Sequence, residues 1–302
     1  MTNAIRVGRR TIAVTHGDRL VFPDSGITKG EIVEHYHRLA PHMLPHVRGR
    51  PVMMQRFPGT GGFGVYQKAI PSHFPEWIQR VTVPKVGGTV THVVCEDAAT
   101  LVYIANQGCI TPHVWLSRVE HLDRPDRMII DLDPGAGGVA DARFAARAAR
   151  ELLAEAGLVP YLMATGSRGY HVVVPLRPAE GFEEVRTVAF GLAEALARRA
   201  PDRLTTEFHK KDRRGRLFLD CNRNAWAQTA VPVYAVRPRE GAPVAVPLEW
   251  EELETTEPDG WTVRTVGERL EHVPDPWRGF SRHARSLDAA RRWLAREGAG
   301  VR

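Results

Sequence analysis

Residues 128–135 read Met-Ile-Ile-Asp-Leu-Asp-Pro-Gly, so an apolar run ends in two acids, a proline and a glycine. This pattern predicts a buried strand that stops at the proline. Side chains alternate between the faces of a strand, which places Asp131 and Asp133 on one face and Leu132 on the other. Two adjacent carboxylates repel each other unless a cation lies between them, and clustered carboxylate oxygens are ligands for Mg²⁺ or Mn²⁺. For the motif taken alone, an exposed turn that closes the strand is the alternative.

A second apolar run that ends in an acid occurs later in the chain, where residues 217–220 read Leu-Phe-Leu-Asp. The same alternation puts Asp220 and Phe218 on one face of this expected strand. If the two strands are neighbours, three carboxylates meet at one edge of a sheet. Two divalent cations held there would lower the pKa of an attacking hydroxyl and neutralise charge on a leaving pyrophosphate. The adjacency is a hypothesis, because sequence spacing does not establish which strands pair.

Two further segments carry groups suited to anions. Residues 165–171 read Thr-Gly-Ser-Arg-Gly-Tyr-His, in which the glycines would let backbone N–H groups face an anion while Ser167 and Arg168 add donors. A simple hairpin turn is the alternative. Residues 209–216 hold five lysines and arginines and one aspartate directly before the second acidic strand. Such a loop either lies in solvent or clamps a phosphate backbone.

The whole chain has the composition of an ordinary soluble globular protein. It has 302 residues, 43% of them hydrophobic and 25% charged, with a modest net charge of +6, and its length allows one large domain or two closely packed ones. No apolar run approaches the roughly 20 residues that span a bilayer, and the N-terminus lacks the apolar core of a secretory signal. Three widely spaced cysteines indicate neither a disulfide framework nor a zinc knuckle. We therefore expect a cytoplasmic protein without a membrane partner.

Local patterns predict elements along the chain. Strands are expected at 11–14, 51–57, 65–68, 110–115, 128–133, 159–164, 170–176, 217–220 and 231–236. Helices are expected from a capping box at Thr28 and Glu31 to Pro41 and Pro45, from Asp97 to Gly108, over 141–156 and 183–200, and from Ser286 to Glu297. Residues 237–276, rich in proline and acid, indicate a surface excursion. We expect His35 and His37 on a helix surface.

The order of these elements predicts the fold class. Strands and helices interleave without the strict alternation of a doubly wound sheet, which indicates an α/β or mixed α+β protein with antiparallel pairings. Residues 59–64 satisfy Gly-x-Gly-x-x-Gly by count. A strand rather than a helix is expected after them, so a dinucleotide-binding fold is disfavoured.

Four motifs taken together resemble one family. They are the Asp-Leu-Asp-Pro-Gly strand end, the Thr-Gly-Ser-Arg-Gly-x-His turn, the Phe-Leu-Asp strand, and residues 229–237, Thr-Ala-Val-Pro-Val-Tyr-Ala-Val-Arg. The combination is similar to the polymerase domain of the bacterial ATP-dependent DNA ligase D, within the archaeo-eukaryotic primase superfamily, over nearly the whole chain. The resemblance implies a single domain over 1–302 with mixed and antiparallel sheets and flanking helices. Its two interleaved modules would lie near 1–120 and 121–302, with the active site between them.

The resemblance also implies an activity. Members add ribo- or deoxyribonucleotides to primer 3′ ends on a template, using two Mn²⁺ or Mg²⁺ ions, at short gaps or double-strand breaks. The implied substrates are nucleoside triphosphates and gapped or broken DNA with a 5′-phosphate. The implied pathway is non-homologous end joining or gap repair, in a bacterial, nucleoid-associated setting.

Residue roles follow from the same resemblance. The metal-binding catalytic residues would be Asp131, Asp133 and Asp220. The nucleotide-binding residues would be His113, Thr165, Ser167, Arg168, His171 and Arg237. The DNA-binding residues would be Arg19, Lys29, Arg56, Phe63, Tyr66, Lys68, Lys210 and Arg213. Among these, Arg19 and Lys29 match the grip on a downstream 5′-phosphate, a role that suits a helix start. Arg213 matches a mobile-loop arginine that helps to order the primer end.

The chain departs from the family in the DNA-binding set. His16 stands where the better-known members carry an asparagine near the 5′-phosphate. Two adjacent phenylalanines stack on the template in those members, whereas the matching positions here are Val65 and Tyr66, with Phe63 nearby. Base stacking contributes about 1–3 kcal/mol per base, so template affinity or gap preference would differ. No ligase or nuclease motif occurs, so we expect a stand-alone polymerase or an excised domain, with Ku and a separate DNA ligase as partners.

Three other functions remain open on sequence alone. A primase-like enzyme would start chains without a primer and would use the same residues. A phosphatase or sugar-nucleotide transferase can use Asp-x-Asp, but the haloacid-dehalogenase type has this pair after its first strand. A non-catalytic nucleic-acid-binding module would need only the basic loop, and the presence of all three carboxylates argues against it.

Overall fold

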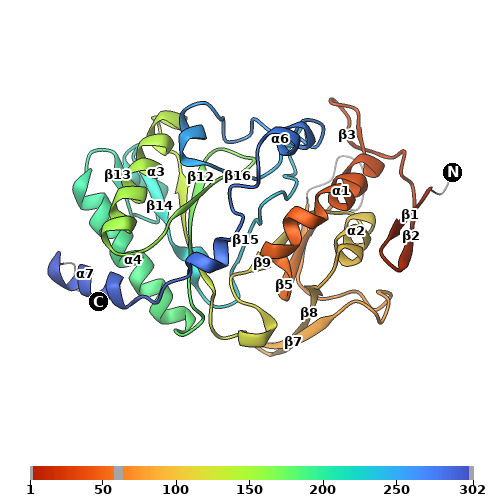
Figure 1. Ribbon diagram of the computed structural model, residues 1–302, viewed down its shortest axis with the longest axis horizontal. Helices are drawn as coiled ribbons and strands as arrows, with labels where there is room; N and C mark the ends of the chain where they lie inside the picture. The colour runs from red at the N-terminus through yellow and green to blue at the C-terminus, as the bar shows by residue number, and fades with distance from the viewer. Residues whose placement is uncertain (1–2, 58–63, 299–302) are drawn as a thin grey trace. The chain divides into compact units, whose positions relative to one another are not determined.

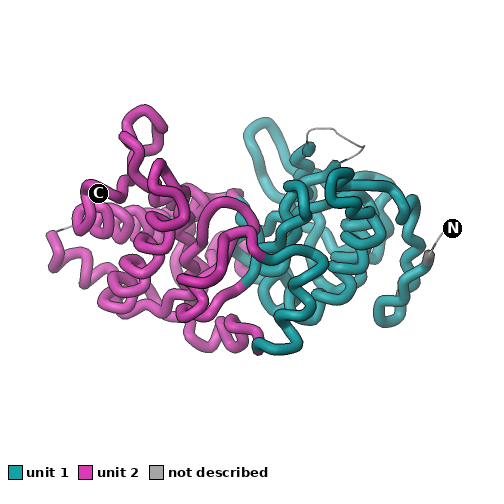
Figure 2. Tube along the Cα trace, turned by 90° about the horizontal axis from the view of Figure 1, so that it is seen from above, with its two compact units in different colours: residues 1–120, 229–246, 261–273 teal, residues 121–228, 247–260, 274–302 magenta. Residues whose placement is uncertain are grey.

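The computed structural model describes residues 3–57 and 64–298 (Figure 1). Contacts divide the chain into two compact units, coloured separately in Figure 2. Unit 1 comprises residues 1–120, 229–246 and 261–273, and unit 2 comprises 121–228, 247–260 and 274–302. Each unit is therefore assembled from segments that lie far apart in the sequence. Phe63 lies outside the described residues.

Unit 1 is built on an antiparallel sheet in the order β15-β9-β5-β8-β7, with β6 also paired to β5. Its strands are β5 (Arg50–Arg56), β6 (Val65–Gln67), β7 (Arg80–Lys85), β8 (Gly88–Cys95), β9 (Cys109–Trp115) and β15 (Thr229–Ala230). Two small hairpins precede the sheet, β1 (Asn3–Val7) with β2 (Arg10–Val14), and β3 (Leu20–Phe22) with β4 (Ile27–Thr28). The helices are α1 (Lys29–Val47), α2 (Ala98–Asn106) and α6 (Val266–His272). Helix α1 packs against α2, and α2 packs against β9 (Figure 1).

Helix α1 begins as predicted and ends later than predicted. The Thr28 hydroxyl accepts from the Glu31 backbone N–H, and the Glu31 carboxylate accepts from the Thr28 N–H, which completes the capping box. The expected end at Pro41 and Pro45 is wrong, because the helix continues to Val47. Each proline removes one helical hydrogen bond. Burial of the apolar face on both sides of the prolines offsets that loss.

Unit 2 is built on a sheet in the order β13-β14-β10-β12-β11-β16. The strands are β10 (Arg127–Asp133), β11 (Tyr161–Ala164), β12 (Tyr170–Pro175), β13 (Leu204–Thr205), β14 (Leu217–Asp220) and β16 (Val246–Leu248). The helices are α3 (Gly138–Glu155), α4 (Phe182–Arg199), α5 (Lys210–Arg213) and α7 (Asp288–Arg296). Helices α3 and α4 contact each other and the central strand β10, and α7 packs on α4 (Figure 1). Short 3-10 helices are η1 (Val119–His121), η2 (Asn222–Asn224), η3 (Trp250–Glu254) and η4 (Phe280–His283).

Several expectations for the C-terminal third are wrong. Residues 231–236, all of them described, form a turn with one isolated bridge instead of a strand, because Pro232 lacks an N–H and Tyr234 has φ of 63°. Residues 237–276 are not a surface excursion, since they supply β16, α6 and buried apolar side chains such as Leu253. The last helix begins at Asp288, and Ser286 lies before it and bonds to the Asp288 carboxylate.

The expected surface position is also wrong for one histidine of α1. His35 is 2% exposed, and its Nε2 lies 2.8 Å from the Tyr234 carbonyl oxygen. Burial lowers the pKa of His35 to about 4. The imidazole is therefore neutral and donates from Nε2. His37, two residues further on, is partly exposed.

The predicted fold class is confirmed. Both large sheets have mainly antiparallel pairings, and β13 pairs with β14 in parallel. All three cysteines are buried free thiols, and burial raises the pKa of each. Within the described residues, every helix is too short or too polar to cross a membrane.

Candidate active site

The two acidic strands are neighbours, as the sequence hypothesis requires. Strand β10 lies between β14 and β12, and Asp131 pairs directly with Asp220 on one side and His171 on the other. Directly opposed residues of an antiparallel pair project on the same face. Asp133 lies two residues further along β10 and shares that face. Three distant segments of the chain thus bring three carboxylates and an imidazole to one edge of the unit 2 sheet.

Each of these side chains has a polar partner. The Nε2 atom of His171 lies 3.4 Å from an oxygen of Asp131. Asp133 accepts from Arg168 at 3.5 Å and from Arg213 at 3.3 Å, one arginine for each carboxylate oxygen. Asp220 is oriented by Asn222, whose backbone N–H and side-chain amide both donate to Oδ1, at 2.8 and 2.7 Å. Asn222 was not among the residues predicted from the sequence, although Asp side chains often bond to backbone groups two residues further along.

The donor chemistry of this cluster suits a hard divalent cation, because its three carboxylates supply only oxygen ligands. The side chains are not gathered into a ready ligand set, since within residues 3–57 and 64–298 no three His, Cys, Asp or Glu residues are grouped closely enough to hold a metal ion. The reason is visible in the contacts. Asp133 is turned toward two guanidinium groups and Asp220 toward Asn222.

Two glycines permit the close backbone contacts that shape this edge. A Cβ on Gly169 would lie 2.1 Å from the Leu132 carbonyl oxygen, and a Cβ on Gly135 would lie 2.2 Å from the Gly215 carbonyl oxygen. The first glycine lets the 165–169 turn pack on the end of β10. The second lets the basic loop pack beside the strand end, where the Ala136 N–H donates to the Gly215 carbonyl at 2.9 Å. The Pro-Gly pair after the acids therefore does more than stop the strand.

The turn at 165–169 divides into a structural part and an exposed part. The backbone N–H and hydroxyl of Thr165 both donate to the Gly169 carbonyl, and the Gly166 N–H donates to the Pro258 carbonyl at 2.8 Å. These donors are used inside the fold. Ser167 is partly exposed, and the Arg168 side chain is 70% exposed. Arg168 is therefore the cation of this turn that an anionic ligand can reach.

His113 and Arg237 belong to unit 1. On β9, the Nε2 of His113 lies 3.2 Å from the side-chain oxygen of Gln55, and the Tyr66 ring stands edge-on at 5.8 Å. Gln55 orients the imidazole, a partner that the sequence did not reveal. Tyr66 lies on β6, as expected, and remains 58% exposed.

A buried hydroxyl network holds the segment that leads to Arg237. The Tyr36 hydroxyl donates to the Ile110 carbonyl at 2.5 Å and accepts from the Val236 N–H at 3.1 Å. The Thr111 hydroxyl donates to the Val236 carbonyl at 2.5 Å. Both backbone groups of Val236 are thus fixed, immediately before Arg237 and beside the strand that carries His113. The sequence did not indicate this role of Tyr36.

Arg19 and Lys29 are brought together at the start of α1. The Lys29 N–H donates to the Arg19 carbonyl at 2.8 Å, and the Lys29 ammonium donates to the Thr15 carbonyl and hydroxyl. Burial, and then the charge of Arg19, lower the pKa of Lys29 to about 8. Two like charges held side by side favour an anion between them. His16, with φ of 52°, lies in the same loop.

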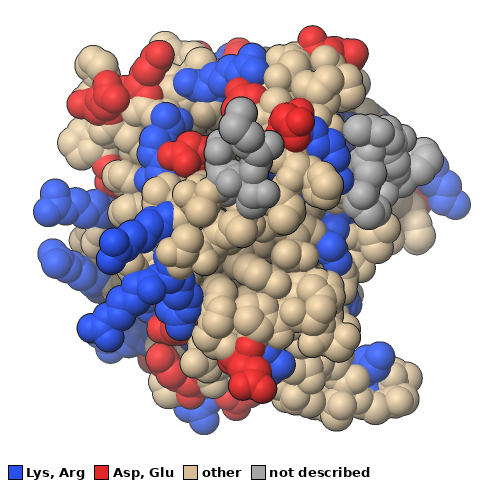
Figure 3. Space-filling view, turned by 90° about the vertical axis from the view of Figure 1, so that its right-hand side faces the viewer, with Lys and Arg blue, Asp and Glu red and all other residues tan. Residues whose placement is uncertain are grey.

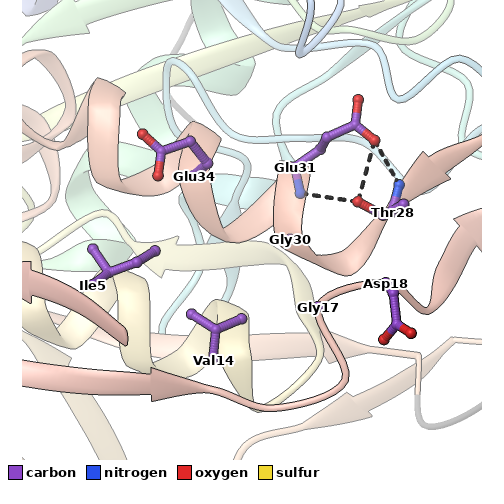
Figure 4. A pocket seen from close by; sticks show the side chains of 8 residues that line it. All are labelled: Ile5, Val14, Gly17, Asp18, Thr28, Gly30, Glu31 and Glu34. Carbon is purple, nitrogen blue, oxygen red and sulfur yellow. Dashed lines mark hydrogen bonds between the residues drawn. The ribbon is translucent and has the colours of Figure 1, made fainter. Parts of the chain in front are cut away.

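A cavity of about 600 Å³ opens beside this helix start (Figure 4). Its charged lining residues are all acidic, namely Asp18, Glu31 and Glu34. Figure 4 shows the carboxylate of Glu31 turned back toward Thr28 within the capping box. An anion is therefore disfavoured inside the cavity. Lys29 and Arg19 are not part of this lining.

The other residues expected to bind DNA differ in their side-chain contacts and in their exposure. Arg56 donates to the Gln107 carbonyl at 2.9 Å and to the Gln67 side chain at 2.6 Å, so it ties β6 to the sheet. Lys68 and Lys210 are exposed. On the face drawn in Figure 3, basic side chains gather on the left side with acidic ones among them. The net charge is therefore not spread evenly over that face.

Arg213 is placed differently from a solvent-exposed loop residue. Its side chain is only 15% exposed, and its guanidinium lies 3.9 Å from the centre of the Phe218 ring while it pairs with Asp133. Arg213 therefore links the basic loop to the carboxylate cluster. The lysines of this loop, on the short helix α5, remain in solvent.

Comparison with known proteins gives consistent matches. A model of the family described as "LigD, primase-polymerase domain" matches residues 28–277. The chain is 32% identical over 299 residues to the "Multifunctional non-homologous end joining protein LigD" of Pseudomonas aeruginosa, covering 97% of this chain and 36% of that protein. It is 32% identical over 253 residues to the "Multifunctional non-homologous end joining DNA repair protein LigD" of Mycobacterium tuberculosis, covering 80% and 33%. The chain thus spans about a third of the length of these relatives.

A solved structure agrees with the sequence matches. The "Polymerase Domain from Mycobacterium tuberculosis Ligase D in complex with DNA" superposes with a TM-score of 0.84 at 28% identity, covering 90% of this chain and 99% of that chain. The primase-like fold and the family resemblance inferred from the four motifs are confirmed. Primase-polymerase domains of this kind are nucleotidyltransferases. Because the family match extends over most of the 302 residues, this chain belongs to the LigD primase-polymerase domain family.

Proposed function

We propose that this protein is a template-directed polymerase that adds nucleotides to primer 3′ ends at short gaps or broken ends of DNA, in non-homologous end joining. The observation that carries the proposal is the register of unit 2. Asp131 lies directly opposite Asp220, with Asp133 on the same face and two arginines beside it. A nucleotidyltransferase needs clustered carboxylates to hold metal ions. It also needs positively charged side chains nearby to stabilise the triphosphate.

The residues divide into roles by their chemistry. Two divalent cations, when bound, supply Lewis acidity toward the attacking hydroxyl and the leaving pyrophosphate, and primase-polymerase domains generally use such metals. Asp131, Asp133 and Asp220 are the residues that would hold them. Arg168 is exposed beside Asp133 and would pair with the phosphates of an incoming nucleotide. Arg213 also pairs with Asp133 and would add positive charge beside the carboxylates that would hold the metals.

In unit 1, His113 and Arg237 are proposed to bind the nucleotide, and Arg19 with Lys29 to bind a downstream 5′-phosphate. The juxtaposed cations at the start of α1 support gap filling over primer-independent synthesis, because starting a chain does not require a 5′-phosphate. The proposed partners are gapped or broken DNA, nucleoside triphosphates, Ku and a separate DNA ligase.

Replacement of one carboxylate tests the proposal. Asp131→Asn keeps the size of the side chain and removes its charge, and primer extension on a 5′-phosphorylated gap should fall by more than about 100-fold. Asp123→Asn is the matched control, because Asp123 is an exposed acid of the same unit, 76% exposed. Extension by the control should equal that of the unaltered protein. Undiminished extension by Asp131→Asn would refute the assignment.

A further inference from the structure

Phe208 is an exposed aromatic side chain in the segment between β13 and α5. It is 65% exposed, whereas Phe218 on the neighbouring strand is 3% exposed. An apolar ring that remains in water forgoes the roughly 1.5–3 kcal/mol gained when such a side chain is buried. A single exposed apolar residue needs no functional explanation by itself. The way in which this ring is supported supplies one.

Arg213 holds the backbone that carries the exposed ring. Its Nε donates to the Glu207 carbonyl at 3.1 Å, and its Nη2 donates to the Phe208 carbonyl at 2.9 Å. The Phe208 ring stands edge-on to Phe218 at 6.4 Å between centroids. Phe218 thus supports the Phe208 ring, and the Arg213 guanidinium holds the Phe208 backbone. A fixed ring loses little conformational freedom when a ligand stacks on it.

The same guanidinium connects the ring to the carboxylate cluster. Arg213 lies over the Phe218 ring at 3.9 Å, and its Nη1 donates to Asp133 at 3.3 Å. Phe218 is the residue of β14 paired with Asp133. Arg213 therefore contacts both the Phe208 backbone and Asp133, one of the carboxylates at which a primer end would react. A base lying on Phe208 would be close to the reacting site within the same unit.

The surroundings of Phe208 are basic. Residues 207–216 contain five lysines and arginines and two acids. Lys210, Lys211 and Arg214 are exposed. An exposed aromatic ring flanked by cations is the combination that binds single-stranded nucleic acid, since bases stack on the ring and the cations pair with phosphates. A protein partner would instead favour a contiguous apolar patch.

We propose that Phe208 is a base-stacking platform for the unpaired 3′-terminal segment of a DNA strand, and that Lys210 and Lys211 hold the phosphates of that segment. The inference rests on the proposed function, because the strand to be extended must reach the carboxylates. Stacking tolerates any base, so the platform would not impose a sequence preference.

Binding without chemistry tests the inference. The probe is a fluorescent duplex with a single-stranded 3′ overhang, titrated by anisotropy at several salt concentrations without nucleotide. Phe208→Ala should weaken binding about 5- to 100-fold with an unchanged salt dependence, and Phe208→Trp should preserve it. Lys210→Ala should weaken binding more evenly and lower the slope of log K against log salt by about 1.

Two controls define the comparison. Trp226→Ala removes another exposed aromatic ring of unit 2, 37% exposed, and should leave the affinity for the overhang unchanged. A blunt duplex without an overhang should bind equally to Phe208→Ala and to the unaltered protein. Equal affinity of the two proteins for the overhang would overturn the inference. So would a Phe208→Leu variant that binds as tightly as Phe208→Trp, because apolarity rather than stacking would then be responsible. If the unaltered protein failed to bind any strand, the proposed function itself would fail.

Discussion

The ammonium group of Lys29 is buried at a helix start beside a second cation. Water is displaced from it, and the charge of Arg19 adds to the cost of keeping it protonated, so its pKa falls to about 8. An incoming phosphate would offset this cost, because its negative charge favours the protonated amine. The charge of this lysine is thus coupled to the ligand that the site is proposed to bind.

This coupling predicts a pH dependence. Protonated Lys29 predominates below pH 8, and binding of a 5′-phosphate requires that form, so affinity falls as pH rises above about 8. The ratio of affinities for 5′-phosphorylated and 5′-hydroxyl gapped DNA should therefore be several-fold lower at pH 9 than at pH 7, measured by anisotropy. Lys29→Arg should keep the ratio constant over this range, because arginine stays charged. A ratio that rose with pH would contradict the assignment.

The carboxylates of the cluster are held by neighbouring side chains. The negative charge of Asp133 is paired with Arg168 and Arg213, and Asp220 is oriented by Asn222. The acids and their strand positions were predictable from alternation and from the terminal Pro-Gly. Their partners were not, because Arg213 lies 80 residues from Asp133 and only the fold brings the two together.

At the scale of elements, α1 organises unit 1 through polar groups on its buried face. Tyr36 joins β9 to the segment before Arg237, and His35 joins the helix to the turn at Tyr234. Burial raises the pKa of Tyr36, so its hydroxyl stays protonated and can donate and accept at once. These bonds fix backbone groups that a turn of irregular shape would otherwise leave unpaired.

Removal of the Tyr36 hydroxyl should lower the stability of the protein and weaken nucleotide binding. Tyr36→Phe leaves the Ile110 carbonyl and the Val236 N–H buried without this partner, which costs about 1–3 kcal/mol of unfolding free energy. Because the segment before Arg237 loosens, KM for nucleotide should rise more than kcat falls. Chemical denaturation and steady-state extension measure the two quantities.

Matched variants separate this role from general packing. Thr111→Ser keeps the hydroxyl that donates to Val236 and should retain a normal KM, whereas Thr111→Val should raise it. Tyr103→Phe on α2, in the same unit, should change neither quantity. A Tyr36→Phe variant that lost stability with an unchanged KM would show that the network is structural only.

The elements themselves were predictable where pattern and context agreed. The capping box of α1, the Asp97 cap of α2 and the strand β10 lie where the sequence indicates. The end of α1 was not predictable from Pro41 and Pro45, because core burial outweighs the lost hydrogen bonds. The apolar run at 231–236 is a turn because tertiary contacts hold Tyr234 in a left-handed conformation.

At the scale of the whole molecule, the chain builds two units from interleaved segments. Local sequence patterns cannot reveal this interleaving. For that reason they wrongly indicated a surface excursion at residues 237–276. The carboxylate cluster depends on the order β14-β10-β12, in which Asp131 pairs with Asp220 on one side and with His171 on the other. The resemblance implied that the three carboxylates act together, whereas the pairing of the two acidic strands was a hypothesis that the sequence could not settle.

The central claim is that these distant carboxylates act together on divalent cations. The most direct measurement is Mn²⁺ binding by isothermal titration calorimetry to the unaltered protein, Asp131→Asn and Asp220→Asn, each saturated with gapped DNA and a nonhydrolysable nucleoside triphosphate. Both substitutions should weaken Mn²⁺ binding at least about tenfold, because each removes an oxygen ligand from a shared site. If Asp220→Asn bound Mn²⁺ as tightly as the unaltered protein, the two strands would not form one metal site, and the account would be contradicted.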